Sequence, residues 1–177
     1  GDNNFTLSKK RTADVCCKII ESNLNKKISF YCQTNVKTNV TTDQANMLKK
    51  AGFEYISLGI ERLTEGGKKL INKYIPDGKI QESIKILRGS GINVNSNMLI
   101  GFPWDTQELV LEENRLFNQI SPSLAQVQSH IIVPMPGTKY YDDYPVMNKW
   151  YLDESFFEAY DTYFSQVLVV YLGPDML

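Results

Sequence analysis

The residues of this 177-residue chain that are best placed to do chemistry are polar side chains at the ends of apolar runs, notably Glu61 and Asn97. A carboxylate such as Glu61 can accept hydrogen bonds from an ammonium or hydroxyl group, and an amide such as Asn97 can both donate to and accept from a diol. Each has a structural alternative: Glu61 could offset the dipole of a following helix, and Asn97 could bond a neighbouring helix end. No phosphate-loop, GxGxxG, HExxH or GxSxG motif accompanies them.

Hydrophobic periodicity alternates between short apolar runs and helical patterns, which predicts an α/β fold. Strands separated by helices need right-handed parallel crossovers, so we expect about four parallel strands with helices outside them. Such folds place their sites beyond the carboxyl ends of the strands. The predicted strands are 28–33, 55–60, 92–100 and 127–133. The predicted helices are 8–23, 42–52, 64–72, 78–88, 106–119 and 154–171.

Charge and hydropathy exclude several classes of partner. Lys and Arg number 19 against 20 Asp and Glu, so no bulk field favours nucleic acid or an anionic membrane. No run approaches the roughly 20 apolar residues that span a bilayer, and residues 1–10 are too polar for a signal peptide. The composition predicts one globular, cytoplasmic domain without nucleic-acid or membrane partners.

The three cysteines, Cys16, Cys17 and Cys32, are an odd number without CxxC or CxxxC spacing. This pattern disfavours both a disulfide framework and a self-contained metal site. We expect all three to be buried or half-buried thiols.

Three segments at predicted strand ends resemble radical S-adenosylmethionine (SAM) enzymes. The run SLGIE at 57–61, with KAG before it and LINK at 70–73, resembles their fourth strand. The run NMLIGFP at 97–103 resembles the fifth strand and its glycine-proline exit, and PMPGT at 134–138 resembles the exit of the sixth. Residues 2–6 and 32–35 are most similar to the cobalamin-dependent branch that includes anaerobic magnesium-protoporphyrin IX monomethyl ester cyclases.

The resemblance implies a parallel β/α partial TIM-type barrel with strands three to six over residues 1–144, and a helical extension over 145–177. It implies a parent enzyme, an oxidoreductase or transferase, that binds SAM and a 4Fe-4S cluster and acts on a small molecule. One electron from the cluster would cleave SAM to a 5'-deoxyadenosyl radical or support methyl transfer or oxidative cyclisation. Cobalamin would bind an upstream domain. The CxxxCxxC loop is absent, so we expect the isolated chain to be inactive and to bind no cluster.

The resemblance also implies cofactor-binding residues but no catalytic residue or metal ligand within the chain. Glu61 would lie beside SAM and Asn97 at its ribose. Gly101 would allow close approach to adenine, although simple turn geometry explains it equally. Weaker candidates are Gln33 and Lys73 for the SAM carboxylate, although Lys73 is better explained as a solvated helix-end cation. Ser57, within the fourth-strand motif, is a further expected cofactor contact. Ile132 and Val133 would form main-chain hydrogen bonds to adenine.

Several residues depart from the family pattern, and several others are better explained by structural roles than by functional ones. Arg62 stands where serine is common, Asn35 where arginine is common, and Trp104-Asp105 where glycine-glutamate is common; these changes could alter substrate choice. His130 is best explained as structural. Tyr55, Phe102 and Trp104 could line a substrate mouth, but core or rim packing is more common. Solvated helix faces explain the pairs Glu112-Glu113 and Lys68-Lys69.

Two other functions fit the same sequence. A non-catalytic α/β module could bind a nucleotide-like ligand or a protein partner through these strand ends. A small TIM-like enzyme could use Glu61 and Asp105 as paired carboxylates, but it lacks a recognisable motif. In either case the strand at 28–33 is a sheet edge, so we expect a second copy, a partner or the amino-terminal segment to cover it.

Overall fold

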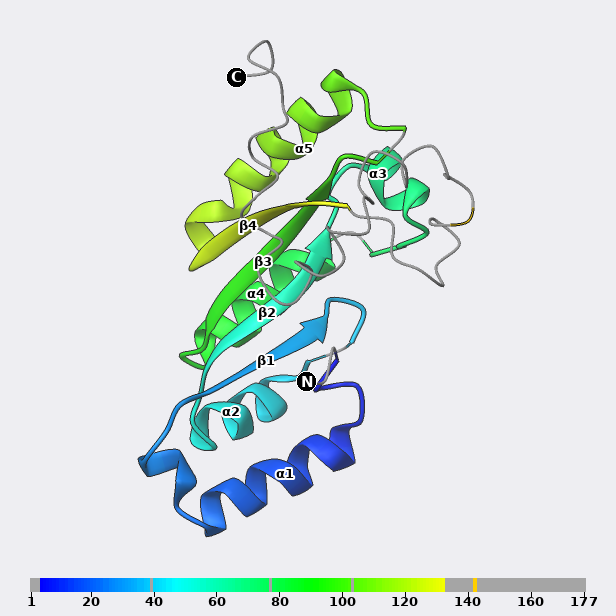
Figure 1. Cartoon of the computed structure of the whole chain (residues 1–177). Helices are drawn as coiled ribbons and strands as arrows, with labels where there is room; N and C mark the ends of the chain where they lie inside the picture. Colours follow the sequence, from blue (N-terminus) through cyan, green and yellow to red (C-terminus); the bar gives the residue numbers. More distant parts are fainter. Residues whose placement is uncertain (1–3, 39, 77, 103, 133–141, 143–177) are drawn as a thin grey trace, which may run out of the picture. The chain divides into compact units, whose positions relative to one another are not determined.

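A computed structural model describes residues 4–38, 40–76, 78–102, 104–132 and 142 (Figure 1). Four strands, β1 (Phe30–Asn35), β2 (Phe53–Glu61), β3 (Asn93–Ile100) and β4 (Gln126–Ile131), form one sheet in the order β1-β2-β3-β4. The β1–β2 and β2–β3 pairs are parallel. The predicted parallel order of the strands is confirmed.

The helices alternate with the strands along the chain, as the periodicity predicts. They are α1 (Lys9–Glu21), α2 (Thr42–Lys50), α3 (Glu65–Leu70), α4 (Lys79–Gly89) and α5 (Gln107–Ile120), with short 3-10 turns η1 (Leu24–Lys26) and η2 (Ser121–Ser123). A further helix, predicted at 154–171, lies outside the described residues, as does the predicted extension at 145–177.

Hydroxyl side chains set the start of four helices. Ser8, Thr41, Thr64 and Thr106 each accept a hydrogen bond from a backbone N–H in the first turn of α1, α2, α3 and α5. Such caps satisfy donors that have no partner within the helix. The helix boundaries therefore agree with prediction to within two residues at most ends. The first strand begins two residues later than predicted, because Ile28 continues the η1 turn by donating to the carbonyl of Leu24 and is half exposed.

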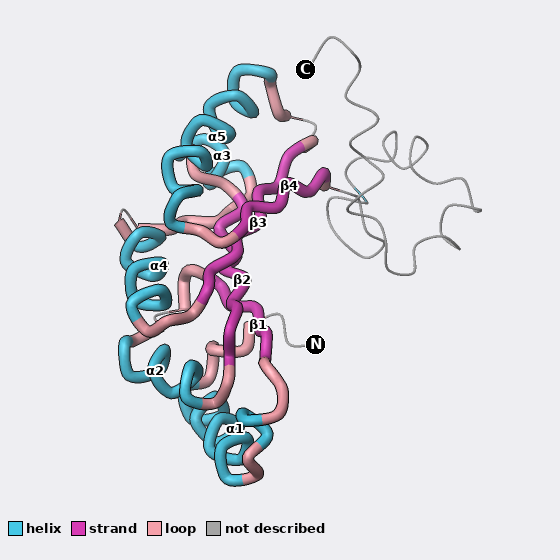
Figure 2. The backbone as a smooth tube through the Cα atoms, turned by 90° about the vertical axis from the view of Figure 1, so that its left-hand side faces the viewer, coloured by secondary structure: helices cyan, strands magenta, loops and turns pink. Residues whose placement is uncertain are grey.

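The chain divides into two compact units by its internal contacts. The first comprises residues 1–99 and 105–129, and the second 100–104 and 130–177. Within the first unit the helices cover one face of the sheet (Figure 2). That face carries Ile56, Leu58 and Ile60, which are fully buried, together with Val94 of β3. This layer is the hydrophobic core.

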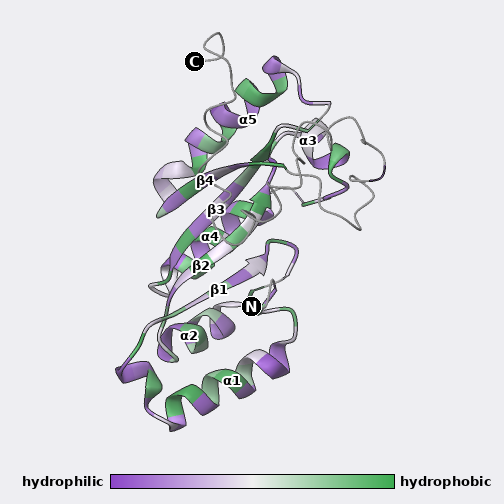
Figure 3. Ribbon diagram, in the orientation of Figure 1, coloured by the Kyte–Doolittle hydropathy of each residue, from purple (hydrophilic) through white to green (hydrophobic). Residues whose placement is uncertain are grey.

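Interleaved polar and apolar residues run along α1, as expected of a helix with one buried side (Figure 3). Its buried residues are Thr12, Cys16 and Ile19, whereas Val15 and Ile20 are half-buried.

The amino-terminal segment covers the carboxyl end of β1. Phe5 donates its N–H to the carbonyl of Gln33 at 2.9 Å, and its ring lies 5.2 Å from that of Phe53. The side-chain oxygen of Asn4 accepts from the Thr34 hydroxyl at 3.1 Å. The chain thus covers part of its own edge strand, as one of the predicted alternatives requires.

Candidate functional site

The face of the sheet opposite the helices carries a row of polar side chains. Gln33, Ser57 and Asn95 occupy matching register positions on β1, β2 and β3, so they share this face. Asn97 lies two residues beyond Asn95 on the same face, toward the carboxyl end. Gln33 is exposed, Ser57 is buried, and the two asparagines are half-buried. A layer of this chemistry offers several donors and acceptors to a polar ligand.

Glu61 ends β2 beside this row. It pairs in register with Met98, the residue after Asn97, so the two polar residues predicted to act together lie on adjacent strands at the same end. The helix-dipole alternative does not fit, because Glu61 belongs to the strand and the acidic residue in the first turn of α3 is Glu65.

Lys73 fixes the carboxylate of Glu61. Its ammonium lies 2.9 Å from Oε1 of Glu61 and donates to the carbonyl of Gly59 at 2.8 Å. The Lys73 side chain is only 7% exposed, so the prediction of a solvated helix-end cation is wrong. No local pattern indicated this burial, because a lysine after a helix is usually solvated. The tertiary fold instead brings it under the end of β2.

A buried charge cluster, defined here as Arg62, Asp105 and Glu113, lies directly after Glu61. The Arg62 guanidinium donates to both carboxylate oxygens of Asp105, at 2.7 and 2.5 Å, and Arg62 NH1 lies 3.9 Å from Oε1 of Glu113. The three side chains are at most 5% exposed. Asp105 is therefore committed to a bidentate ion pair, which does not support the alternative of Glu61 and Asp105 as paired catalytic carboxylates.

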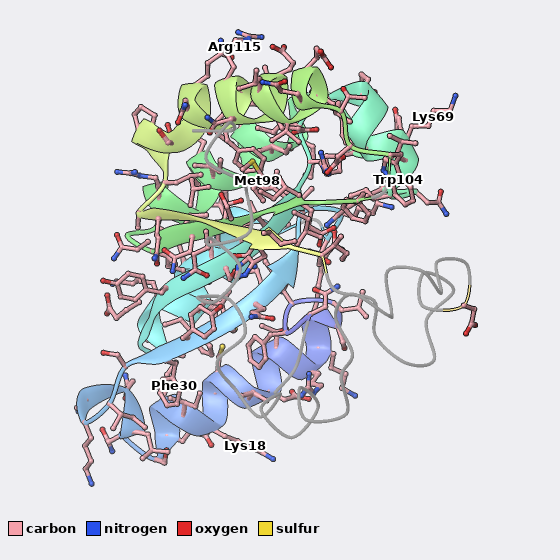
Figure 4. All side chains as sticks on the ribbon, turned by 45° about the horizontal axis from the view of Figure 1, so that its top comes forward. Lys18, Phe30, Lys69, Met98, Trp104 and Arg115 are labelled. Carbon is pink, nitrogen blue, oxygen red and sulfur yellow. The ribbon has the colours of Figure 1, made fainter. Side chains whose placement is uncertain are left out.

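Glu113 contradicts the prediction of a solvated helix face. It is fully buried and accepts from the backbone N–H of Leu63 at 2.7 Å and from the hydroxyl of Thr64 at 2.5 Å. Its neighbour Glu112 is solvated as predicted, and its pKa is held below the usual value by the hydrogen bond from Arg115. Arg115 projects outward from α5 in Figure 4.

The two lysines of the pair on α3 also differ in burial. Lys68 is buried and ion-paired with Glu65, so the prediction of a solvated face is wrong for this residue. Lys69 is exposed and extends away from the ribbon (Figure 4), as predicted.

Two sequence departures from the family pattern are thus partners. Arg62 after β2 and Asp105 after β3 were noted separately, and the fold joins them into one ion pair. The two residues are 43 positions apart in the sequence, so no local pattern indicates that they are in contact. Asn35, the third departure, ends β1 opposite Gly59.

The second unit contains the candidates expected at adenine. Gly101 has φ +83°, and a Cβ there would lie 2.8 Å from Cγ2 of Ile131, so glycine is required by turn geometry and by packing. The N–H of Ile132 donates to the carbonyl of Ile100 at 2.8 Å. Val133 lies outside the described residues.

Two of the three aromatic candidates for a substrate mouth pack against each other. Phe102 and Trp104 stack with ring centroids 4.9 Å apart, which supports the packing explanation for this pair. Trp104 is labelled in Figure 4. Tyr55 is 46% exposed on the polar face of the sheet. His130 is half-buried at the end of β4.

The cysteines do not form a metal site. Cys16 and Cys32 are buried as predicted, whereas Cys17 is exposed, so the prediction of burial is wrong for that thiol. Burial, with a smaller effect from Cys17, raises the pKa of Cys16 to about 11, which disfavours the thiolate that metals bind. Within the described residues no three His, Cys, Asp or Glu side chains are grouped to hold a metal ion. These residues do not fit a 4Fe-4S cluster.

Two hollows open beside the segments that follow β1 and β2. One, of about 550 Å³, is lined by Lys37, Tyr74, Pro76, Lys79 and Glu82. The other, of about 430 Å³, is lined by Glu65, Gly66, Lys68, Lys69, Asn72, Lys73 and Tyr74. Among the described lining residues, Lys73 also belongs to the candidate site through its ion pair with Glu61. No helix in the described part of the chain is long and apolar enough to cross a membrane.

Comparison with known proteins supports the resemblance drawn from the motifs. The chain is 28% identical over 147 residues to an uncharacterised methyltransferase of Pyrococcus horikoshii, covering 83% of this chain and 31% of the relative. It is 26% identical over 144 residues to the anaerobic magnesium-protoporphyrin IX monomethyl ester cyclase of Cereibacter sphaeroides, covering 80% and 23%. No family model matches the chain.

Solved structures give the same fold. The radical SAM methyltransferase TsrM of Kitasatospora setae, solved with cobalamin and a 4Fe-4S cluster bound, matches with a TM-score of 0.60 at 16% identity, over 76% of this chain and 25% of TsrM. Coproporphyrinogen III oxidase of Escherichia coli, a radical SAM enzyme, matches with a TM-score of 0.54 at 16% identity, over 66% and 29%.

The fold is therefore that of part of the barrel in these solved radical SAM enzymes, as the motifs predicted, and the two curated relatives are a methyltransferase and a cyclase. The cobalamin bound in TsrM agrees with the predicted likeness to the cobalamin-dependent branch. The chain spans between about a quarter and a third of the length of the first two curated relatives.

Proposed function

We propose that this chain supplies the SAM-facing side of strands three to six in a longer radical SAM enzyme. The observation that carries the proposal is the position of Glu61, whose carboxylate is held by Lys73 at the end of β2, next to Asn97 and the polar row. Carboxyl ends of parallel strands are where such folds bind ligands.

The polar residues suit the parts of SAM that need hydrogen bonds. Glu61 would accept from the ammonium or a ribose hydroxyl, and Asn97 would donate to and accept from the ribose diol. Ser57 and Gln33 would support the amino-acid end. The adenine contacts expected of Gly101 and Ile132, which belong to the second unit, remain predictions. When bound, SAM supplies a methyl group or, after reductive cleavage, a hydrogen-abstracting radical.

The activity of the longer protein is part of the proposal. The cysteines of this chain do not fit a 4Fe-4S cluster, so cluster ligands would come from elsewhere in that protein, and cobalamin would come from a further domain. Its substrate would be a small molecule that enters on the polar face. The division into a barrel part at 1–144 and an extension at 145–177, and a cytoplasmic location, remain predictions.

The free edge of β1 suggests self-association. The amino-terminal segment covers its carboxyl end, but Tyr31 remains 53% exposed. We propose that a second copy or the missing neighbouring strands pair with this edge. Analytical ultracentrifugation of the chain should show concentration-dependent dimers; a monomer at high concentration would argue against pairing between copies.

The test of the SAM proposal is equilibrium SAM binding by the reconstituted longer protein. Glu61→Gln should weaken binding about tenfold or more, since a hydrogen bond to a charged group contributes about 1.5–3 kcal/mol. Glu54→Gln is the matched control, because Glu54 is also in β2 and pairs with a lysine, Lys49 at 2.6 Å, but faces the helices. Equal affinities for the two variants would remove the role proposed for Glu61.

The isolated chain gives a second measurement. It offers only a few hydrogen bonds of about 1 kcal/mol each, set against the entropy cost of capturing a free ligand. Calorimetry should therefore detect no SAM binding tighter than the high-micromolar range. Tight binding would show that this part of the barrel suffices for recognition, contrary to the proposal.

A further inference from the structure

Glu61 adopts a backbone conformation that side chains other than glycine rarely take. Its φ is +69°, and the N–H of Arg62 donates to the carbonyl of Ile60 at 2.9 Å. That hydrogen bond closes a three-residue γ-turn with Glu61 at its centre, and a positive φ marks the rarer, strained form of this turn. Strained residues persist only where their surroundings impose them.

Both neighbours of Glu61 are firmly held. Ile60 is fully buried in the core at the end of β2. Arg62 is also fully buried, and its guanidinium forms two hydrogen bonds to Asp105 from the β3 exit. The short turn between them leaves the backbone of Glu61 little freedom, because either anchor would have to move for φ to relax.

Glu113 extends this anchor to α5 and α3. Its carboxylate accepts from the N–H groups of Leu63 and Thr64, the two residues after Arg62. The Thr64 hydroxyl, which also donates to Glu113, caps α3 by accepting from the N–H of Gly67 at 2.9 Å. The segment after Glu61 is therefore fixed residue by residue to the cap of α3.

We infer that the buried charge cluster of Arg62, Asp105 and Glu113 is a positioning device that holds Glu61 in the γ-turn and aims its carboxylate across the end of the sheet. In this role the three residues act through the backbone of Glu61. Lys73 then fixes the carboxylate itself. What the carboxylate contacts rests on the proposed function, but the conformational claim does not.

The conformational claim is tested by NMR on the chain itself. A positive φ brings the amide and Hα protons of one residue close together, so Glu61 should show a strong intraresidue NOE. Asp105→Asn removes the charge that pairs with Arg62 and should reduce this NOE at least twofold. Glu112→Gln, on the exposed side of α5, is the control and should leave it unchanged.

Arg62→Lys provides a second variant if Asp105→Asn does not fold. It keeps the positive charge, but a single ammonium cannot replace both NH2, which binds the two oxygens of Asp105, and NH1, which lies 3.9 Å from Glu113, so the NOE should again fall. A full-strength NOE in either variant, with a folded spectrum, would overturn the positioning role. So would a loss that occurs in Lys73→Met but not in the cluster variants.

SAM binding by the longer protein separates this inference from the proposed function. Asp105→Asn should weaken SAM about tenfold, as Glu61→Gln does, while Glu112→Gln binds normally. If the NOE falls in Asp105→Asn but SAM affinity is unchanged in both Asp105→Asn and Glu61→Gln, the positioning role stands and the proposed function fails. If Glu61→Gln weakens SAM binding and the NOE keeps its full strength in Asp105→Asn, the proposed function stands and the positioning role fails.

Discussion

Two adjacent glycines in α3 provide a direct test of the buried charge cluster. A Cβ built on Gly67 would collide with Oε1 of Glu113, and would lie 2.8 Å from Oγ1 of Thr64 and 3.1 Å from Cδ of Arg62. A Cβ on Gly66 would meet no atom within 4 Å. The two sites share a helix and a residue type, so they differ mainly in what the new methyl group contacts.

The expected effects have opposite signs. Replacing glycine by alanine in a helix stabilises by about 0.5–1 kcal/mol, and Gly66→Ala should show this gain. At Gly67 the gain is outweighed by overpacking of about 1–3 kcal/mol and by the loss of about one hydrogen bond to the Glu113 carboxylate, about 1.5–3 kcal/mol. The net destabilisation by Gly67→Ala should be about 2–4 kcal/mol.

Urea unfolding followed by circular dichroism measures both values on the same chain. The midpoint should rise for Gly66→Ala and fall for Gly67→Ala, with similar slopes for both transitions, since a similar surface is exposed. If the two variants proved equally stable, Glu113 could not lie against Gly67, and the buried position of that carboxylate would be refuted.

Three further predictions concern single side chains. Ellman's reagent should modify Cys17 at once but Cys16 only on unfolding, since one is exposed and the other is buried; equal rates would contradict this. The pKa of the Cys16 thiol is raised to about 11 from an ordinary 9.0. Between these two pH values the thiol stays protonated in the folded chain but is ionised in the unfolded chain. Its stabilising effect should therefore be complete below pH 9 and disappear as the pH rises toward 11, and Cys16→Ala should flatten that part of a stability-against-pH curve. Glu113→Gln should lower the free energy of unfolding by about 2–3 kcal/mol, whereas Glu112→Gln should leave it almost unchanged; similar values would place both carboxylates in solvent.

Local patterns in the sequence determined the elements and their order. Short apolar runs that alternate with helical patterns were enough to predict the parallel α/β arrangement. The motif at 57–61 likewise identified Glu61 as a strand-end carboxylate, because its signal is contained within a few consecutive residues.

Only the tertiary structure decided which charges are buried. Arg62 and Asp105 are 43 residues apart, and Glu113 differs from its solvated neighbour Glu112 only in the side of α5 on which it lies. Burial of a charge depends on partners from other elements that offset its desolvation, and no local pattern reports those partners. The strained turn at Glu61 has the same origin, since its φ is imposed by anchors on both sides and not by its own residue type.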